Sequence, residues 1–180
     1  DAANEEVCSI ATSMEPEAFY ALAFAASVYY NQAFVVIESN GPGGQLCARF
    51  AESYPRDRLY HRDDWNEART LRRRAVGHFT HMGNRDIMIG KLAEAVLTNN
   101  IALYDERGID QFRTFVYKKT GRVEAAQGKR DDHVFAAGLA LMGAGVARKR
   151  TSGMYGMEAA KKLMWQRTQA RQTADSVTGY

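Results

Sequence analysis

The sequence predicts an α/β fold in a single domain that spans residues 1–180. Two observations support this prediction. Residues 34–37 form a short, fully apolar run, as expected for a central parallel strand that is buried on both faces. An apolar helical segment precedes this run, and a loosely alternating segment precedes that helix. The order strand, helix, buried strand is typical of α/β domains.

The first elements follow from alternation and from capping residues. Residues 6–13 alternate loosely and contain Val, Ile and Thr, which predicts a strand. Pro16 suits the first turn of the helix that follows, and Ser13 is in position to cap it. Asn31 ends this helix, directly before the buried strand.

The middle of the chain combines turn formers with charged segments. The glycine-rich loop 38–44 allows a close approach of another backbone, and a helix is expected over 45–53. A short strand is expected over 58–61, followed by an exposed, charged loop over 62–75. Apolar residues at helical spacing then predict a long amphipathic helix over 83–100.

The last third alternates strands and helices. The predicted elements are a strand over 101–104, a short helix over 108–115, a β-hairpin formed by 116–119 and 122–125, a core helix over 131–147 and a final helix over 155–171. The domain core is expected within residues 5–147, with a C-terminal helix and tail over 154–180.

Charge is unevenly distributed along the chain. Residues 1–60 carry a net charge of −5, residues 61–130 a net charge of +5 and residues 131–180 a net charge of +3. This division suits a polyanion-binding face beside an acidic metal pocket. No apolar run reaches the roughly 20 residues that span a bilayer, so no membrane partner is expected. Cys8 and Cys47 lack metal-ligand spacing, which favours free thiols.

Several common active sites are excluded by their motifs. Gly44 is followed by Gln45 rather than by Lys and Ser or Thr, so the chain has no Walker A loop and no ATPase motor. The four histidines do not form HExxH, and no serine lies in GxSxG. Zinc hydrolase and serine hydrolase chemistry therefore have no support.

Two acidic features remain as candidate sites. Glu38 stands at the carboxyl end of the buried strand, the edge where open α/β sheets bind ligands, although the loop behind it could be a simple turn. Asp131 and Asp132 precede an apolar helix, where they could be a cap and a dipole partner. Adjacent carboxylates at a core edge need a neutralising partner, which is either the basic pair Lys129 and Arg130 or a divalent metal such as Mg²⁺.

Five segments together resemble the nuclease domain of the large terminase subunit of tailed bacteriophages. They are VVIESNG (35–41), GHFT (77–80) with Arg85 in the next helix, FRTFV (112–116), GRVEA (121–125) and GKRDDHV (128–134) before an alanine-rich helix. They occur in the order and spacing of the family and cover about residues 5–145.

The resemblance implies an RNase H-like fold and a metal-dependent endonuclease that cuts concatemeric double-stranded DNA during genome packaging. By resemblance, Glu38, Asp131 and Asp132 are catalytic and hold two Mg²⁺ or Mn²⁺ ions, and the DNA-binding residues are Lys129, Arg130, Arg85 and Asn40. The implied partners are the portal protein and the small terminase subunit, in the host cytoplasm at the procapsid portal. ATP would belong only to the motor domain, which these 180 residues do not contain.

The chain departs from the family at its start. The first catalytic aspartate of the family lies on a strand that we expect upstream of Asp1, and Asp1 is a poor substitute for it. Two alternatives stay open: another RNase H-like nuclease of the resolvase or integrase type, and a non-catalytic DNA- or portal-docking module.

Overall fold

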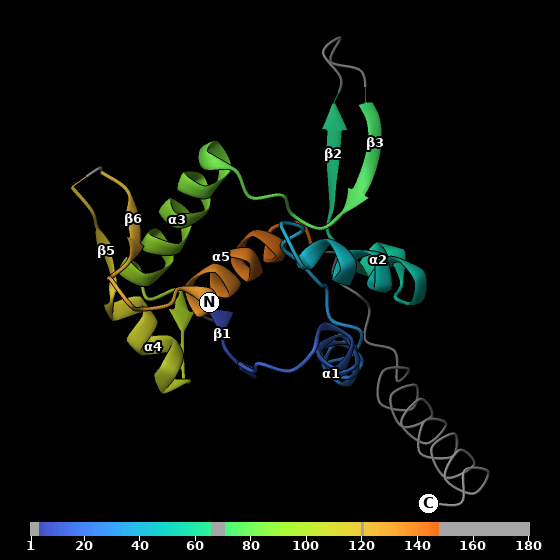
Figure 1. Cartoon of the computed structure of the whole chain (residues 1–180), viewed down its shortest axis with the longest axis horizontal. Coiled ribbons are helices and arrows are strands. Elements are labelled where there is room, and N and C mark those ends of the chain that lie inside the picture. Colours follow the sequence, from blue (N-terminus) through green and yellow to red (C-terminus); the bar gives the residue numbers. More distant parts are fainter. Residues whose placement is uncertain (1–3, 66–70, 120, 148–180) are drawn as a thin grey trace, which may run out of the picture.

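The computed structural model describes residues 4–65, 71–119 and 121–147, and these residues form a mixed α/β architecture (Figure 1). The helices are α1 (Pro16–Tyr29), α2 (Gly43–Ser53), α3 (Met82–Leu97), α4 (Glu106–Arg113) and α5 (Asp132–Ala144), with a 3₁₀ turn at Arg56–Arg58. The strands are β1 (Asn4–Glu5), β2 (His61–Trp65), β3 (Leu71–Val76), β4 (Ile101–Ala102), β5 (Phe115–Tyr117) and β6 (Val123–Ala125). Asp1 and the predicted helix over 155–171 lie outside the described residues.

The strands pair two by two. β1 is parallel to β4, whereas β2 with β3 and β5 with β6 are antiparallel. The predicted buried strand is an extended stretch, the Glu38 segment (residues 34–38), which isolated parallel bridges join to Leu59 and His78. The structure therefore confirms a mixed α/β architecture, and the larger RNase H-like sheet stays a prediction.

Three local predictions about residues 6–61 were wrong. Residues 6–13 form no strand, because only β1 is paired and the last backbone bond of this ladder runs from the Glu6 N–H to the Ala102 C=O. The predicted strand over 58–61 is instead the end of a 3₁₀ turn, a bridge at Leu59 and the start of β2. Ser13 does not cap α1, since Glu15 occupies the N-cap position and makes no side-chain cap.

The charged stretch 62–75, expected as a loop, contributes most of a β-hairpin that stands away from the other elements (Figure 1). Asp63 and Arg74 lie opposite each other in β2 and β3, and Arg74 Nε donates to Asp63 Oδ1 at 3.0 Å. Opposite charges on facing strands stabilise a polar hairpin. Hydropathy does not detect such a hairpin, because neither strand needs an apolar face.

Most helices were predicted correctly. α1 ends where Asn31 adopts a positive φ of 61°, and α2 begins two residues before its predicted start, at Gly43. α3, α4, α5 and the hairpin of β5 with β6 agree with the predictions apart from shifts at their ends. In the described part of the chain, no helix combines the length and apolar character that crossing a membrane requires.

The core has two parts that meet at the Glu38 segment. α1 and α2 pack through an aromatic cluster in which Tyr20 and Phe50 meet edge to face, with ring centroids 5.3 Å apart. α3 packs against α5, and Met88 is fully buried in their contact. Burying side chains of this size contributes about 1.5–3 kcal/mol each relative to leaving them exposed.

Glycines allow α5 to approach its two neighbours closely. A Cβ at Gly138 would lie 2.9 Å from Met88 Cγ of α3, and a Cβ at Gly143 would lie 2.5 Å from Val36 Cγ2 of the Glu38 segment. Both distances are shorter than real Cβ contacts. α5 is therefore held between α3 and the Glu38 segment by contacts that a larger residue would permit only if Met88 or Val36 shifted.

Candidate active site

Glu38 is directed toward α5 by the alternation of the segment that it ends. Ile37 belongs to the α1–α2 core, whereas Phe34 and Val36 lie against Gly143 of α5. Side chains alternate between the two faces of an extended chain, so Glu38 shares the α5 face with Phe34 and Val36. The sequence pattern that predicted a strand thus also sets the direction of this carboxylate.

The glycine-rich loop packs against Glu38 itself. A Cβ at Gly43, the first residue of α2, would overlap the Glu38 carbonyl oxygen, and Gly41 adopts a positive φ of 52°. The predicted close backbone approach is therefore present, and it joins the start of α2 to Glu38. A side chain at Gly43 would displace either α2 or Glu38.

Asp131 and Asp132 begin α5. Asp131 is the N-cap residue, and its carbonyl accepts the Phe135 N–H at 3.0 Å, but its carboxylate makes no cap hydrogen bond. Asp132 lies in the first turn, where the helix dipole favours a negative charge. Because the Asp131 side chain does not cap the helix, capping alone does not account for the acidic pair.

The three predicted carboxylates line one cavity of about 830 Å³. Its polar lining comprises Glu38, Arg85, Glu124, Asp131 and Asp132, and its apolar lining comprises Phe19, Ala125, Phe135, Ala136 and Leu139. The sequence reasoning did not assign a role to Glu124, which lies on β6. Glu124 is the glutamate of the GRVEA segment, which carries part of the resemblance and could have pointed to it.

The donor chemistry of this cavity fits the metal that the resemblance implies. Mg²⁺ and Mn²⁺ prefer carboxylate oxygens, and the cavity presents four carboxylates from three separate elements. Among the residues that the structure describes, no three His, Cys, Asp or Glu side chains are grouped closely enough to hold an ion. The carboxylates would therefore have to move together to bind a metal.

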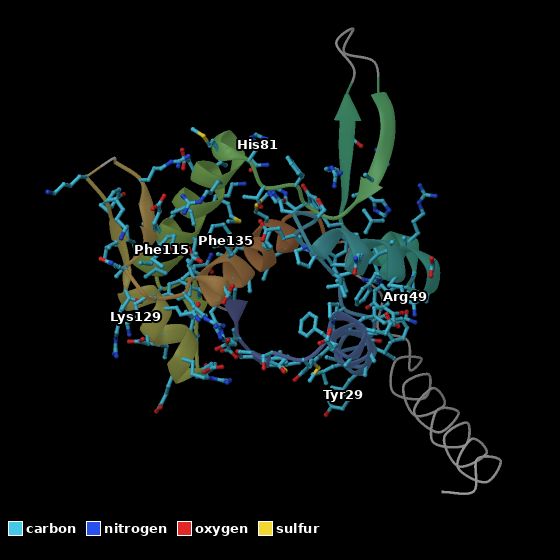
Figure 2. The ribbon with its side chains drawn as sticks, in the orientation of Figure 1. Tyr29, Arg49, His81, Phe115, Lys129 and Phe135 are labelled. Atoms are coloured by element: carbon cyan, nitrogen blue, oxygen red, sulfur yellow. The ribbon has the colours of Figure 1, made fainter. Side chains whose placement is uncertain are left out.

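Arg85 is anchored at the wall of this cavity. Its Nη2 donates to the Val123 carbonyl at 2.7 Å, and its guanidinium carbon lies 5.3 Å from the ring centroid of Phe135 and 6.0 Å from that of Phe115. Figure 2 shows Phe115 and Phe135 close together between β5 and α5. The aromatic contacts hold a positive charge beside the acidic pair.

The other predicted DNA-binding residues have different surroundings. Lys129 Nζ lies 3.2 Å from Asp110 Oδ2, in an exposed ion pair. The Asn40 amide donates to the Thr80 carbonyl and accepts the Thr80 N–H, both at 2.8 Å. Arg130 lines a neighbouring cavity of about 780 Å³. Only Arg85 of the four predicted DNA-binding residues therefore lines the cavity that contains Glu38.

One edge of the Glu38 segment borders on no described strand. Val35, Ile37 and Ser39 make backbone hydrogen bonds to residues 58–60 and to His78. The backbone groups of Phe34, Val36 and Glu38 point to the opposite edge, and no backbone hydrogen bond joins them to another described residue. This edge can accept a further strand at Phe34 and Val36, whereas Gly43 already packs on the Glu38 carbonyl.

His78 lies next to Glu38 on the paired edge. It is buried, with 5% of its surface exposed, and its ring meets the Tyr60 ring edge to face at 5.9 Å. Burial lowers the pKa of His78, and the nearby Glu38 carboxylate acts in the opposite direction. His78 is the histidine of the GHFT segment, which carries part of the resemblance, but the sequence alone indicates no role for it.

Comparison of the chain with protein-family models, with curated proteins and with solved structures found no match.

Proposed function

We propose that this chain is a metal-dependent DNA endonuclease domain of the terminase type, with an RNase H-like fold. The observation that supports the proposal is that Glu38, Asp131 and Asp132 line one cavity. The resemblance implies that these residues, which come from distant motifs, form one site, and their place in one cavity agrees with that implication. A set of unrelated surface carboxylates would not be expected to line one cavity.

In this proposal, Glu38, Asp131 and Asp132 hold two Mg²⁺ or Mn²⁺ ions, and Glu124 is available as a further oxygen donor. Two bound ions supply a hydroxide nucleophile and stabilise the leaving oxygen of the phosphodiester.

Arg85 has the clearest role in holding DNA. Its contacts with two aromatic rings leave the guanidinium charge next to the carboxylates, where the scissile phosphate would lie. Lys129 and Arg130 precede α5 and would contact the phosphates on either side. Asn40 would have to give up its two bonds to Thr80 in order to contact DNA.

The wider setting of the proposal rests on the resemblance. The substrate would be concatemeric double-stranded DNA, cut when packaging begins and ends. The partners would be the portal protein and the small terminase subunit, at the procapsid in the host cytoplasm. ATP would act only in a separate motor domain.

Conversion of supercoiled plasmid to open-circular and linear DNA with Mn²⁺ tests the proposal. We expect Glu38→Ala and Asp132→Ala to abolish this cleavage while DNA binding survives, because these carboxylates would hold the metal rather than the DNA. Normal cleavage by either variant would contradict the site assignment. Binding of DNA by the wild type without any cleavage would favour the docking module instead.

A further inference from the structure

His78 and Glu38 occupy facing positions in a parallel bridge. The His78 N–H donates to the Ile37 carbonyl at 2.7 Å, and the Ser39 N–H donates to the His78 carbonyl, also at 2.7 Å. Residues that face each other in such a bridge direct their side chains to the same face of the sheet. The imidazole of His78 and the carboxylate of Glu38 are therefore neighbours on the face that α5 covers.

The imidazole carries an unsatisfied nitrogen. His78 Nε2 is buried and has no hydrogen-bond partner among the residues that the structure describes. Buried polar atoms are nearly always hydrogen-bonded in folded proteins, so an unpartnered one needs an explanation. One explanation is a partner that reaches the nitrogen when the site is in its working arrangement.

The charged groups around the imidazole leave one suitable acceptor. The neighbours that act on His78 electrostatically are Glu38, Arg62 and His81. Arg62 is a donor whose Nη1 already bonds to Ser39 Oγ at 2.9 Å, and His81 caps α3. Glu38 is the anionic member of this group, and its carboxylate accepts hydrogen bonds.

We propose that His78 is the positioning residue of Glu38: Nε2–H donates to one carboxylate oxygen and turns the other oxygen toward the cavity. The backbone bridge already fixes the two residues side by side, which places the carboxylate and the imidazole on adjacent positions of one face. Fixing the carboxylate would reduce the rearrangement needed to assemble a metal site. The contact concerns the neutral imidazole, and its consequence for metal binding rests on the proposed function.

Mn²⁺ affinity in two substitutions at His78 separates positioning from simple packing. The amide nitrogen of His78→Gln reaches the place of Nε2, whereas the shorter side chain of His78→Asn does not. We expect Asn to weaken Mn²⁺ binding by about 10- to 100-fold, as loss of such a partner does at metal sites, and Gln to restore it. Thr80→Val, which removes another buried unpartnered atom, is the matched control and should leave the affinity unchanged. Equal affinities in all three variants and the wild type would overturn the proposal, and so would equal losses in Asn and Gln.

A second measurement needs no metal. The ¹⁵N chemical shifts of the His78 ring, recorded at pH 8, report which nitrogen carries the proton. We expect the Nε2–H form in the wild type and a change in its population in Glu38→Ala. Identical ¹⁵N shifts of the His78 ring in the wild type and in Glu38→Ala would overturn the proposal. Shifts that follow Glu38 in a protein that binds no Mn²⁺ would uphold the contact and would count against the nuclease function.

Discussion

Glu38 and Asp132 line the same cavity, although one ends an extended segment near the N-terminus and the other begins the last described helix. Their meeting depends on α5, which crosses the Glu38 segment at Gly143 and carries Asp132 at its other end. The relative position of the two carboxylates therefore depends on how α5 packs against the Glu38 segment.

Asp131 and Asp132 are expected to differ in importance. Asp132 lines both cavities, whereas Asp131 lines only the one that contains Glu38 and also occupies the N-cap position of α5. Asp131→Asn should therefore reduce Mn²⁺-dependent plasmid cleavage less than Asp132→Asn. Initial rates of plasmid cleavage by the two variants measure this difference. A larger loss in Asp131→Asn would reverse the assignment of the principal ligand.

The packing of α5 against the Glu38 segment can be tested at Gly143. A Cβ there would meet Val36, so Gly143→Ala should lower the free energy of unfolding by about 1–3 kcal/mol and weaken Mn²⁺ binding. Gly90→Ala in α3 is the control, because nothing lies within 4 Å of its added Cβ, and it should stabilise the protein by about 1 kcal/mol. Chemical denaturation measures both changes. A neutral Gly143→Ala would show that α5 does not depend on this close approach.

The basic residues should contact phosphates rather than bases. Arg130→Gln, Lys129→Gln and Arg85→Gln should each weaken DNA binding for all sequences and flatten the salt dependence by about one unit of log K against log salt. The ion pair of Lys129 with Asp110 is exposed and should not prevent this contact. Arg49→Gln is the control, since Arg49 pairs with Glu17 and Glu52 and lines neither cavity. An altered sequence preference with an unchanged salt slope would contradict phosphate binding.

Asp105 gives a prediction about acid stability. Its hydrogen bonds to Arg107 and Ser9 hold the pKa of this carboxyl well below its usual range, and it also caps α4. A depressed native pKa stabilises the fold above the unfolded value of about 3.9, and this stability is lost as the pH falls further. Asp105→Asn should therefore lower Tm at pH 7, and the difference from the wild type should shrink below about pH 4. A difference that stays constant from pH 7 to pH 3 would show that the ion pair with Arg107 adds nothing.

The parts of the fold that follow from local rules could be predicted from the sequence. α1, α3 and α5 have long apolar patterns with clear ends, and Asn31 ends α1 in the left-handed conformation. The positions of Glu38 at the end of an apolar run and of Asp132 at a helix start were likewise predicted. These features depend on neighbours along the chain.

The features that the sequence reasoning missed depend on partners from elsewhere in the chain. The polar hairpin of β2 and β3 is stabilised across strands by pairs such as Asp63 with Arg74, and residues 7–13 have strand-like composition without a strand beside them. Glu124 enters the cavity because β6 lies next to Arg85, which no spacing along the chain reveals. Pairing between strands and the packing of α5 had to come from the structure.

In the proposed function, Glu38 and Asp132 bind a divalent metal together. Titration of the chain with Mn²⁺, followed by the electron paramagnetic resonance signal of the free ion, measures this directly. We predict binding by the wild type that is lost in both Glu38→Gln and Asp132→Asn and kept in Glu94→Gln, which replaces an exposed carboxylate on α3. Equal Mn²⁺ binding by the wild type and by both cavity variants would contradict the claim.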